Sequence, residues 1–105
     1  MSVEVKITVN NSSDAAKVAQ RYLSVFGEVV KVEMQDYEKY DSDDHLLTLT
    51  NKDGDKMLVN YLTSGYVGHG PNNLKKILVS AGYEKEKVEE LVSNNNSFNI
   101  QEEIL

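Results

Sequence analysis

Hydrophobic and polar positions alternate at the start of the chain and then change to a helical spacing. Apolar residues at every second position of 3–9 are typical of a half-buried β-strand. Asn10 to Ser13 supply turn and N-cap residues, and Asp14 suits the first turn of a helix. The next apolar positions follow at i, i+3, i+4, i+7, i+8 and i+11, which predicts one core-facing helix side made of Ala15, Val18, Ala19, Tyr22, Leu23 and Phe26. Gly27 is predicted to end this helix in a left-handed conformation.

Three further strand-like runs follow, at 29–34, 45–50 and 56–62. In the first of these runs, period-two spacing places Val30, Val32 and Met34 on one face. The other two runs flank residues 51–55, in which Asp53-Gly54 is a strong hairpin signal.

The C-terminal third of the chain has two more helical patterns. The first is predicted to run from Pro71, as the first helical residue, to Ala81, with Gly82 as a left-handed C-cap. The second covers 84–93. Phe98 and Ile100 fit an edge strand, and residues 101–105 a fraying end. The order β-α-β-β-β-α-α over residues 1–105 predicts a single α+β domain with a mostly antiparallel sheet and helices packed on one face.

Charge is unevenly distributed along the chain. The net charge is −6. Residues 33–55 carry eight acids and two lysines, a balance of −6, whereas the remaining nine acids and nine bases cancel. This distribution disfavours nucleic acid, whose phosphates require Lys and Arg, and favours a basic protein partner.

Within this region, residues 36–44 form an acidic segment that also contains two tyrosines. One interpretation is a polar hairpin connection that keeps the protein in solution. The other is a docking surface, in which aromatic rings supply contact area and carboxylates steer a basic target. The candidate contacts of that surface are Tyr37, Tyr40, Asp41, Asp43 and Asp44.

A glycine-rich segment, residues 65–71, lies between the last strand-like run and the second predicted helix. Three of the six glycines and the only proline fall in these seven residues. The glycines either form a tight strand-to-helix connection or line a ligand or partner site. The second interpretation is possible because glycine lets a bound molecule approach the backbone closely. Tyr66 either folds onto the core or stacks on a partner, and His69 is either an ordinary loop histidine or a polar contact. The candidate contacts here are Gly65, Tyr66, Gly68, His69 and Gly70.

Residues that could support catalysis or metal binding are few. The chain has no cysteine and two histidines, which excludes thiolate sites and His-rich metal sites. The glycine spacing matches neither the P-loop nor the dinucleotide-binding pattern, and Ser64 with His69 has no nucleophile-elbow context. Acidic loops at 41–44 and 51–55 lack the glycine at position six and the glutamate at position twelve of a calcium loop. We therefore predict no catalytic residue, no metal and no cofactor.

These observations favour a small acidic, non-enzymatic interaction protein of the inhibitor, immunity or accessory type that binds a basic protein. The alternative is a small-molecule or anion-binding module that uses residues 65–70 at the N-terminus of the helix predicted over 71–81. An enzyme with His69 as acid or base ranks third, because no partner for this histidine is evident. Without an apolar signal core or a membrane-length apolar run, we expect a cytoplasmic protein.

Overall fold

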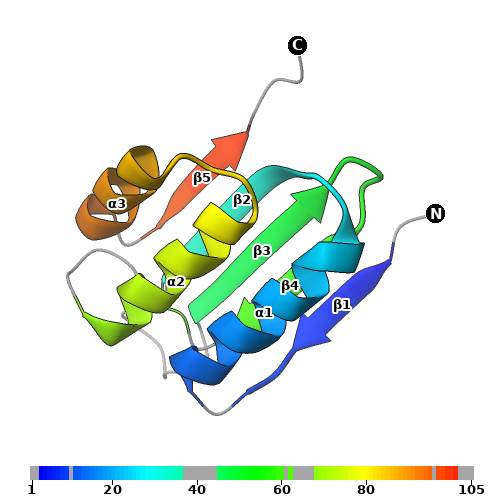
Figure 1. Cartoon of the computed structure of the whole chain (residues 1–105), viewed down its shortest axis with the longest axis horizontal. Helices are drawn as coiled ribbons and strands as arrows, with labels where there is room; N and C mark the ends of the chain where they lie inside the picture. Colours follow the sequence, from blue (N-terminus) through cyan, green and yellow to red (C-terminus); the bar gives the residue numbers. More distant parts are fainter. Residues whose placement is uncertain are drawn as a thin grey trace.

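The computed structural model describes residues 3–9, 11–36, 45–60, 62, 68–95 and 97–101. They form one small α+β domain of five strands and three helices (Figure 1). In chain order the elements are β1 (Glu4–Ile7), α1 (Ser12–Phe26), β2 (Val29–Asp36), β3 (His45–Asn51), β4 (Lys56–Asn60), α2 (His69–Ser80), α3 (Lys85–Asn94) and β5 (Phe98–Gln101).

The sheet is mixed and has the strand order β1-β4-β3-β2-β5. β2, β3 and β4 form an antiparallel meander, and β5 adds to β2 in the antiparallel sense. β1 pairs with β4 in parallel, so the expectation of a mostly antiparallel sheet misses this pairing. A parallel partner is possible because the chain crosses over between β1 and β4 through α1 and the first two meander strands. β5 confirms the edge strand expected at Phe98 and Ile100, and it adds an eighth element to the predicted order.

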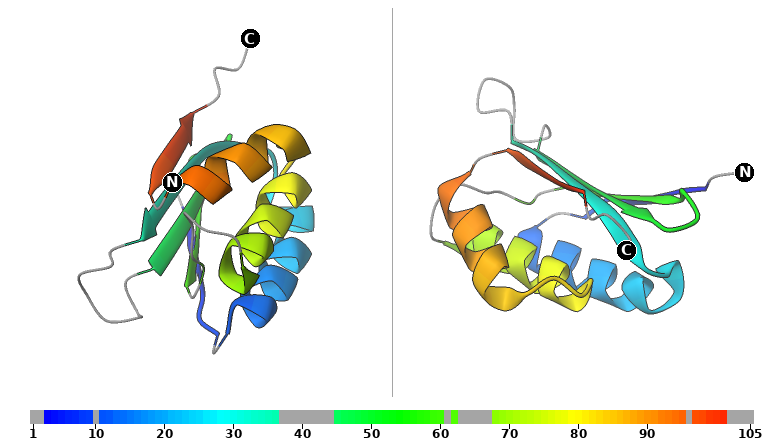
Figure 2. Two further views of the ribbon diagram at one scale, coloured as in Figure 1. Left: turned by 90° about the vertical axis from the view of Figure 1, so that its left-hand side faces the viewer. Right: turned by 90° about the horizontal axis from the view of Figure 1, so that it is seen from above.

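All three helices lie on the same face of the sheet, as Figure 2 shows when the sheet is seen edge-on. The core is the layer between that face and the helices. Its fully buried side chains alternate along the strands and recur at helical spacing on α2 and α3, as a sheet with one covered face requires. They include Val32, Met34, Leu47, Leu49, Met57, Val59, Leu74, Ile77, Leu78, Val88 and Val92.

Helix α1 begins at the predicted place and buries most of the predicted face, with one exception. Asn11 caps it, because its side-chain oxygen accepts the Asp14 N–H at 2.8 Å. The most deeply buried positions are the alanines, Ala15, Ala16 and Ala19. Tyr22, predicted to face the core, is 44% exposed. Val18, Leu23 and Phe26 pack against the core as predicted, so Tyr22 is the one member of the predicted face that lies outside it, in a groove beside Val3 and Val5.

Strand β2 contains a bulge that changes its inward-facing set. Val29 pairs with Asn51 and Lys31 with Thr50, which leaves Val30 as an extra residue. The alternation shifts by one position at this bulge. Val29 is therefore buried, whereas Val30, predicted to share the core face with Val32, is only half-buried.

Helix α2 starts two residues before the predicted start. Gly68 is its N-cap, so Pro71 is the third helical residue rather than the first. The proline costs no helical hydrogen bond, because the first bond of the ladder joins the Asn72 N–H to the Gly68 carbonyl at 3.0 Å. At the other end, the Gly82 N–H reaches the Val79 carbonyl and the Tyr83 N–H the Leu78 carbonyl, which is the Schellman arrangement. The predicted stop at Gly82 is confirmed.

A buried asparagine holds the predicted β3–β4 hairpin together. Asn51 is 3% exposed, and its side-chain oxygen accepts the N–H groups of Asp53 and Asp55 at 3.0 and 2.8 Å. Its amide nitrogen donates to the Phe26 carbonyl at 2.6 Å, at the end of α1. In the same turn, Asp55 accepts the Val3 N–H at 2.8 Å. One side chain and its neighbour therefore connect the hairpin with α1 and β1.

The two helix-ending glycines have positive φ, as predicted: +96° at Gly27 and +106° at Gly82. We expect Gly82→Val to lower the free energy of unfolding by about 1–2 kcal/mol. Gly27→Val should cost about 1–3 kcal/mol, because Gly27 combines its φ with a ψ of −172°, a region almost confined to glycine. Urea denaturation measures both, with Ser13→Val on exposed α1 as the control. Unchanged stability in both glycine variants would contradict these helix boundaries.

Removal of the Asn51 side chain should destabilise the fold strongly. Asn51→Ala leaves two N–H groups of the turn and the Phe26 carbonyl without their partner, at an expected cost of about 2–4 kcal/mol. Asn60→Ala is the matched control, because among the described residues the Asn60 side chain bonds one partner, the backbone of Val9, at 3.1 and 3.5 Å. Equal losses in thermal or urea denaturation would show that Asn51 has no special role in the hairpin.

Candidate functional site

The two ends of the sheet differ in what connects the strands. At one end, here the turn end, the short β3–β4 turn lies beside the end of α1 and the start of β1. At the other end, here the loop end, β2 and β4 finish, β3 begins, and the chain enters both α1 and α2. Figure 1 shows the loop end at the bottom of the view. Both candidate segments from the sequence depart from the loop end.

The strand register brings the ends of these two segments together. Asp36 pairs with His45, so residues 37–44 leave and re-enter the sheet on adjacent strands. Asn60 pairs with Leu46, so the chain departs toward α2 one strand further along. With neighbouring strands about 4.8 Å apart, the three attachment points span roughly 10 Å. Segments separated by two dozen residues in sequence therefore start from one narrow strip of the sheet.

Most of the predicted contacts fall outside the described residues. These are Tyr37, Tyr40, Asp41, Asp43, Asp44, Gly65 and Tyr66. Gly68, His69 and Gly70 are placed at the N-terminus of α2, as the N-cap and the first two helical residues. The φ of Gly68 is 171°, which is extended backbone open to any residue, and Gly70 is helical. A left-handed backbone therefore does not account for glycine at these two positions.

The acidic region of the sequence is divided between the two ends of the sheet. Residues 36–44 belong to the loop end and carry five acids and one lysine, a balance of −4. Asp53 and Asp55 lie in the β3–β4 turn, at the opposite end of β3, roughly 20 Å away for a seven-residue strand. Asp55 is also engaged with the Val3 N–H. The acids of the turn end are thus separated from those of the segment that joins β2 to β3.

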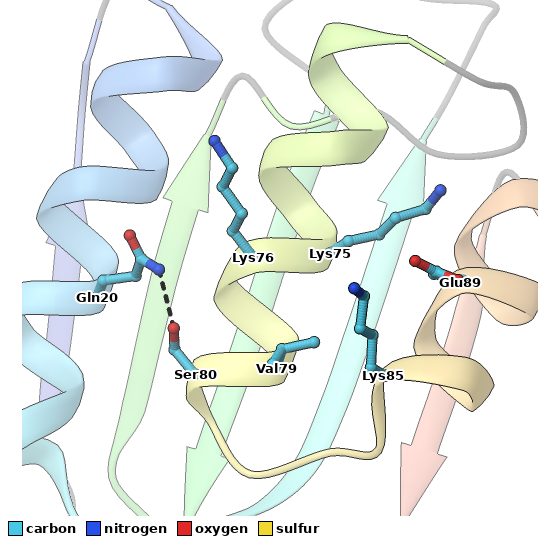
Figure 3. Close-up of a pocket in the computed structure, with 7 residues that line it drawn as sticks. All are labelled: Gln20, Lys75, Lys76, Val79, Ser80, Lys85 and Glu89. Atoms are coloured by element: carbon cyan, nitrogen blue, oxygen red, sulfur yellow. Dashed lines mark hydrogen bonds between the residues drawn. The ribbon is translucent and has the colours of Figure 1, made fainter.

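A groove with positive charge lies over the helices, away from the sheet. Lys75, Lys76 and Lys85 line it together with Glu89, and its volume of about 320 Å³ is close to the lower limit of roughly 300 Å³ for small-molecule pockets. Gln20 donates to the Ser80 hydroxyl at 2.9 Å along one side, which ties α1 to α2. In Figure 3, Lys76 points toward α1 and Lys75 toward α3. Their ammonium groups diverge instead of meeting at one anion position.

Three asparagines that the sequence analysis did not single out have important structural positions. Asn51 organises the turn end, Asn60 extends the pairing of β1 and β4 to Val9, and Asn73 is buried within α2 at 4% exposure. Hydrophobic periodicity does not detect them, because a polar residue at a core-facing position looks like an interruption of the pattern. Asn51-x-Asp53-Gly54 did carry a signal, since asparagine commonly bonds backbone two residues on.

Metal ligands do not cluster in the part of the chain that the structure describes: no group of three or more His, Asp or Glu side chains lies together there. None of the described helices has the length and apolarity to span a membrane. Comparison of the chain with protein-family models, with curated proteins and with solved structures finds no match. The functional assignment therefore rests on this chain's own residues.

Tyr66 is expected to contribute to binding and not to folding. The Tyr66→Ala variant should retain wild-type stability and lose the partner, because the ring of a tyrosine in a glycine-rich segment can supply contact area to a bound molecule. The core reference is Leu74→Ala, which empties a fully buried position and should cost about 2–5 kcal/mol. Tyr22 does not serve as this reference, since it is exposed. If Tyr66→Ala matches Leu74→Ala in denaturation, the tyrosine belongs to the core and the segment is a tight connection.

Proposed function

We propose that this protein is a non-enzymatic interaction protein of the inhibitor, immunity or accessory type that binds a basic protein partner through its loop end. The acidic segment 36–44 supplies the charge, and the glycine-rich segment 65–71 supplies Tyr66 and His69 as neighbouring contacts. Nucleic acid is not the partner in this proposal, and the protein acts in the cytoplasm.

The observation that carries the proposal is the common origin of the two segments on β2, β3 and β4. A protein interface needs about 800 Å² from each partner, more than one short loop provides. Two connections that leave the same strip of sheet supply a larger continuous surface. Rigid strands beneath them fix where both begin, which is how binding loops are commonly supported.

Charge at this end favours a basic partner. A balance of −4 in nine residues creates a local field that attracts cations and accelerates their encounter with the protein. The acids of the turn end do not add to it, since β3 separates them from the loop end. The proposal therefore concerns Asp41, Asp43 and Asp44, and not Asp53 or Asp55.

The alternative function is an anion- or small-molecule-binding module at the N-terminus of α2. The backbone N–H groups of Gly68 to Gly70 would contact the anion in that case. The described residues favour this alternative less, because Lys75 and Lys76 point to different neighbours (Figure 3). A phosphate metabolite or nucleotide that co-purifies with the protein would support it, whereas a stoichiometric basic protein supports the first proposal.

Neutralisation of the acidic segment should slow partner association. The triple variant D41N/D43N/D44N is expected to reduce the association rate constant at low salt by about tenfold and to flatten its salt dependence, because steering scales with the local field. The partner is first isolated by affinity capture from a lysate of the source cells, and rates are then measured by surface plasmon resonance over a range of salt concentrations.

The matched control removes the same charge elsewhere. E86Q/E89Q/E90Q neutralises three exposed carboxylates on α3, which lies over β2 and β5 on the helical face. This variant should retain most of the wild-type association rate. Equal slowing in both triple variants would show that total charge, and not the acidic segment, governs the encounter. Wild-type rates for D41N/D43N/D44N at low salt would refute docking on the acidic segment.

A further inference from the structure

The outer edge of β1 combines an open strand with an apolar surface. β1 is the last strand of the five described, and its register with β4 has no bulge. The described chain exposes four large apolar side chains, and three of them lie here: Val3 at 55%, Tyr22 at 44% and Val25 at 81%. With Val5, Phe26 and Met57 they line a shallow groove between β1 and α1. Such a patch beside an unpaired strand marks an interaction surface.

Helix α1 exposes two large apolar side chains, Tyr22 and Val25, on the flank that lines the groove beside β1. Val18, Tyr22 and Val25 follow one another at i, i+4 and i+7, on one flank of the helix. The other flank carries Gln20, which bonds to Ser80 of α2. Val18 is partly buried against the core, whereas Tyr22 and Val25 are exposed. Figure 1 shows α1 as the outermost helix, next to β1.

We infer that this surface binds a second copy of the same chain, through antiparallel pairing of the two β1 strands around a two-fold axis at Val5. The result is a continuous ten-stranded sheet. The apolar flanks of the two α1 helices lie on the same face of that sheet, one on each side of the axis. A two-fold interface must be self-complementary, and both the backbone and the charges of β1 meet this condition.

The backbone of β1 directs the correct groups outward. The Val3 carbonyl accepts the Lys56 N–H at 2.8 Å, so the backbone carbonyl of Val3 points toward β4. Because directions alternate along a strand, the N–H and carbonyl groups of Glu4 and Lys6 point to the open edge. In antiparallel pairing, two outward-facing residues must lie opposite each other to exchange their hydrogen bonds. A two-fold axis at Val5 places Glu4 opposite Lys6 of the second copy, which satisfies this requirement.

Side-chain charge selects the same register. Opposite charges directly across two strands stabilise the pair, and like charges oppose it. An axis at Val5 creates two Glu–Lys pairs. A shift to an axis at Glu4 or at Lys6 keeps the backbone bonding but sets two like charges against each other. A lone lysine on an edge strand prevents pairing, whereas this Glu-Val-Lys spacing is complementary to itself.

The acidity of the whole chain does not oppose this contact. Residues 3–26, which contain β1 and α1, carry Glu4 and Asp14 against Lys6, Lys17 and Arg21, a balance of +1. The acidic segment joins β2 to β3, and β4 separates these two strands from β1. Dimerisation at β1 therefore leaves the proposed docking surface of each copy accessible, and the two inferences stand independently.

Sedimentation equilibrium of the purified full chain, from low to high micromolar concentration, tests the dimer. We expect a monomer–dimer equilibrium for the wild type. Glu4→Lys and Lys6→Glu should each raise the dimer dissociation constant by about tenfold or more, since each reverses two symmetric charge pairs. The double variant E4K/K6E should recover wild-type affinity. This rescue separates dimerisation from folding. Within one chain, Glu4→Lys places a second positive charge beside Lys56 both in the single variant and in E4K/K6E, so a folding defect from that charge would persist in the double variant.

A second pair of variants examines the apolar flank of α1. Val25→Lys should weaken the dimer without loss of thermal stability in the monomer, because Val25 is almost fully solvated there. Val79→Lys is the matched control, a charge at another exposed valine, on α2 and far from β1, and it should leave the dimer intact. The inference would be overturned if the wild-type protein stays monomeric at every concentration. It would also be overturned if neither Val25→Lys nor the two charge reversals weaken the dimer, or if Val25→Lys and Val79→Lys weaken it equally.

Discussion

The side chain of Asn51 is the interaction on which the arrangement of the turn end depends. It is an amide with almost no solvent contact whose oxygen and nitrogen bond the backbone of two separate segments, the hairpin turn and the end of α1. Beside it, the Lys52 N–H donates to the Glu28 carbonyl at 2.9 Å, which fixes the entry into β2. A buried polar group is costly unless all its bonds are made, so this geometry permits one relative placement of helix and hairpin.

This fixed end contrasts with the loop end. At the turn end, four residues connect β3 and β4. The side chains of Asn51 and Asp55 there form hydrogen bonds within the domain. At the loop end, eight residues join β2 to β3 and eight join β4 to α2. Rigid strands with long connections at one end are the usual design of a binding protein, because the scaffold determines where the loops begin and their side chains supply specificity. The acids are divided in the same way: Asp55 bonds within the turn, whereas the acids of residues 36–44 belong to the long connection at the loop end.

The two edges of the mixed sheet are unpaired in the described chain but differ in the side chains beside them. β5 pairs with β2 alone, and at the opposite edge β1 pairs with β4 alone. On that side α1 presents Tyr22 and Val25 instead of the buried alanines of its inner face. The β1 edge is apolar and nearly neutral, and the loop end is acidic. The two proposals therefore concern different parts of one small domain: the dimer contact uses the β1 edge, and the contact with a basic partner uses the loop end.

The sequence alone determined the element types and most of their limits, because apolar periodicity, Asn11, Asp53-Gly54 and Gly82 act within a few residues. It also identified the poverty of catalytic groups and the acidic region. Only the tertiary structure decided the parallel β1–β4 pairing, the exposure of Tyr22, the bulge at Val30 and the separation of Asp53 and Asp55 from the acidic segment. These features depend on which distant segments meet. Periodicity records that a residue is apolar, but the neighbouring helix and strand determine which apolar positions are covered.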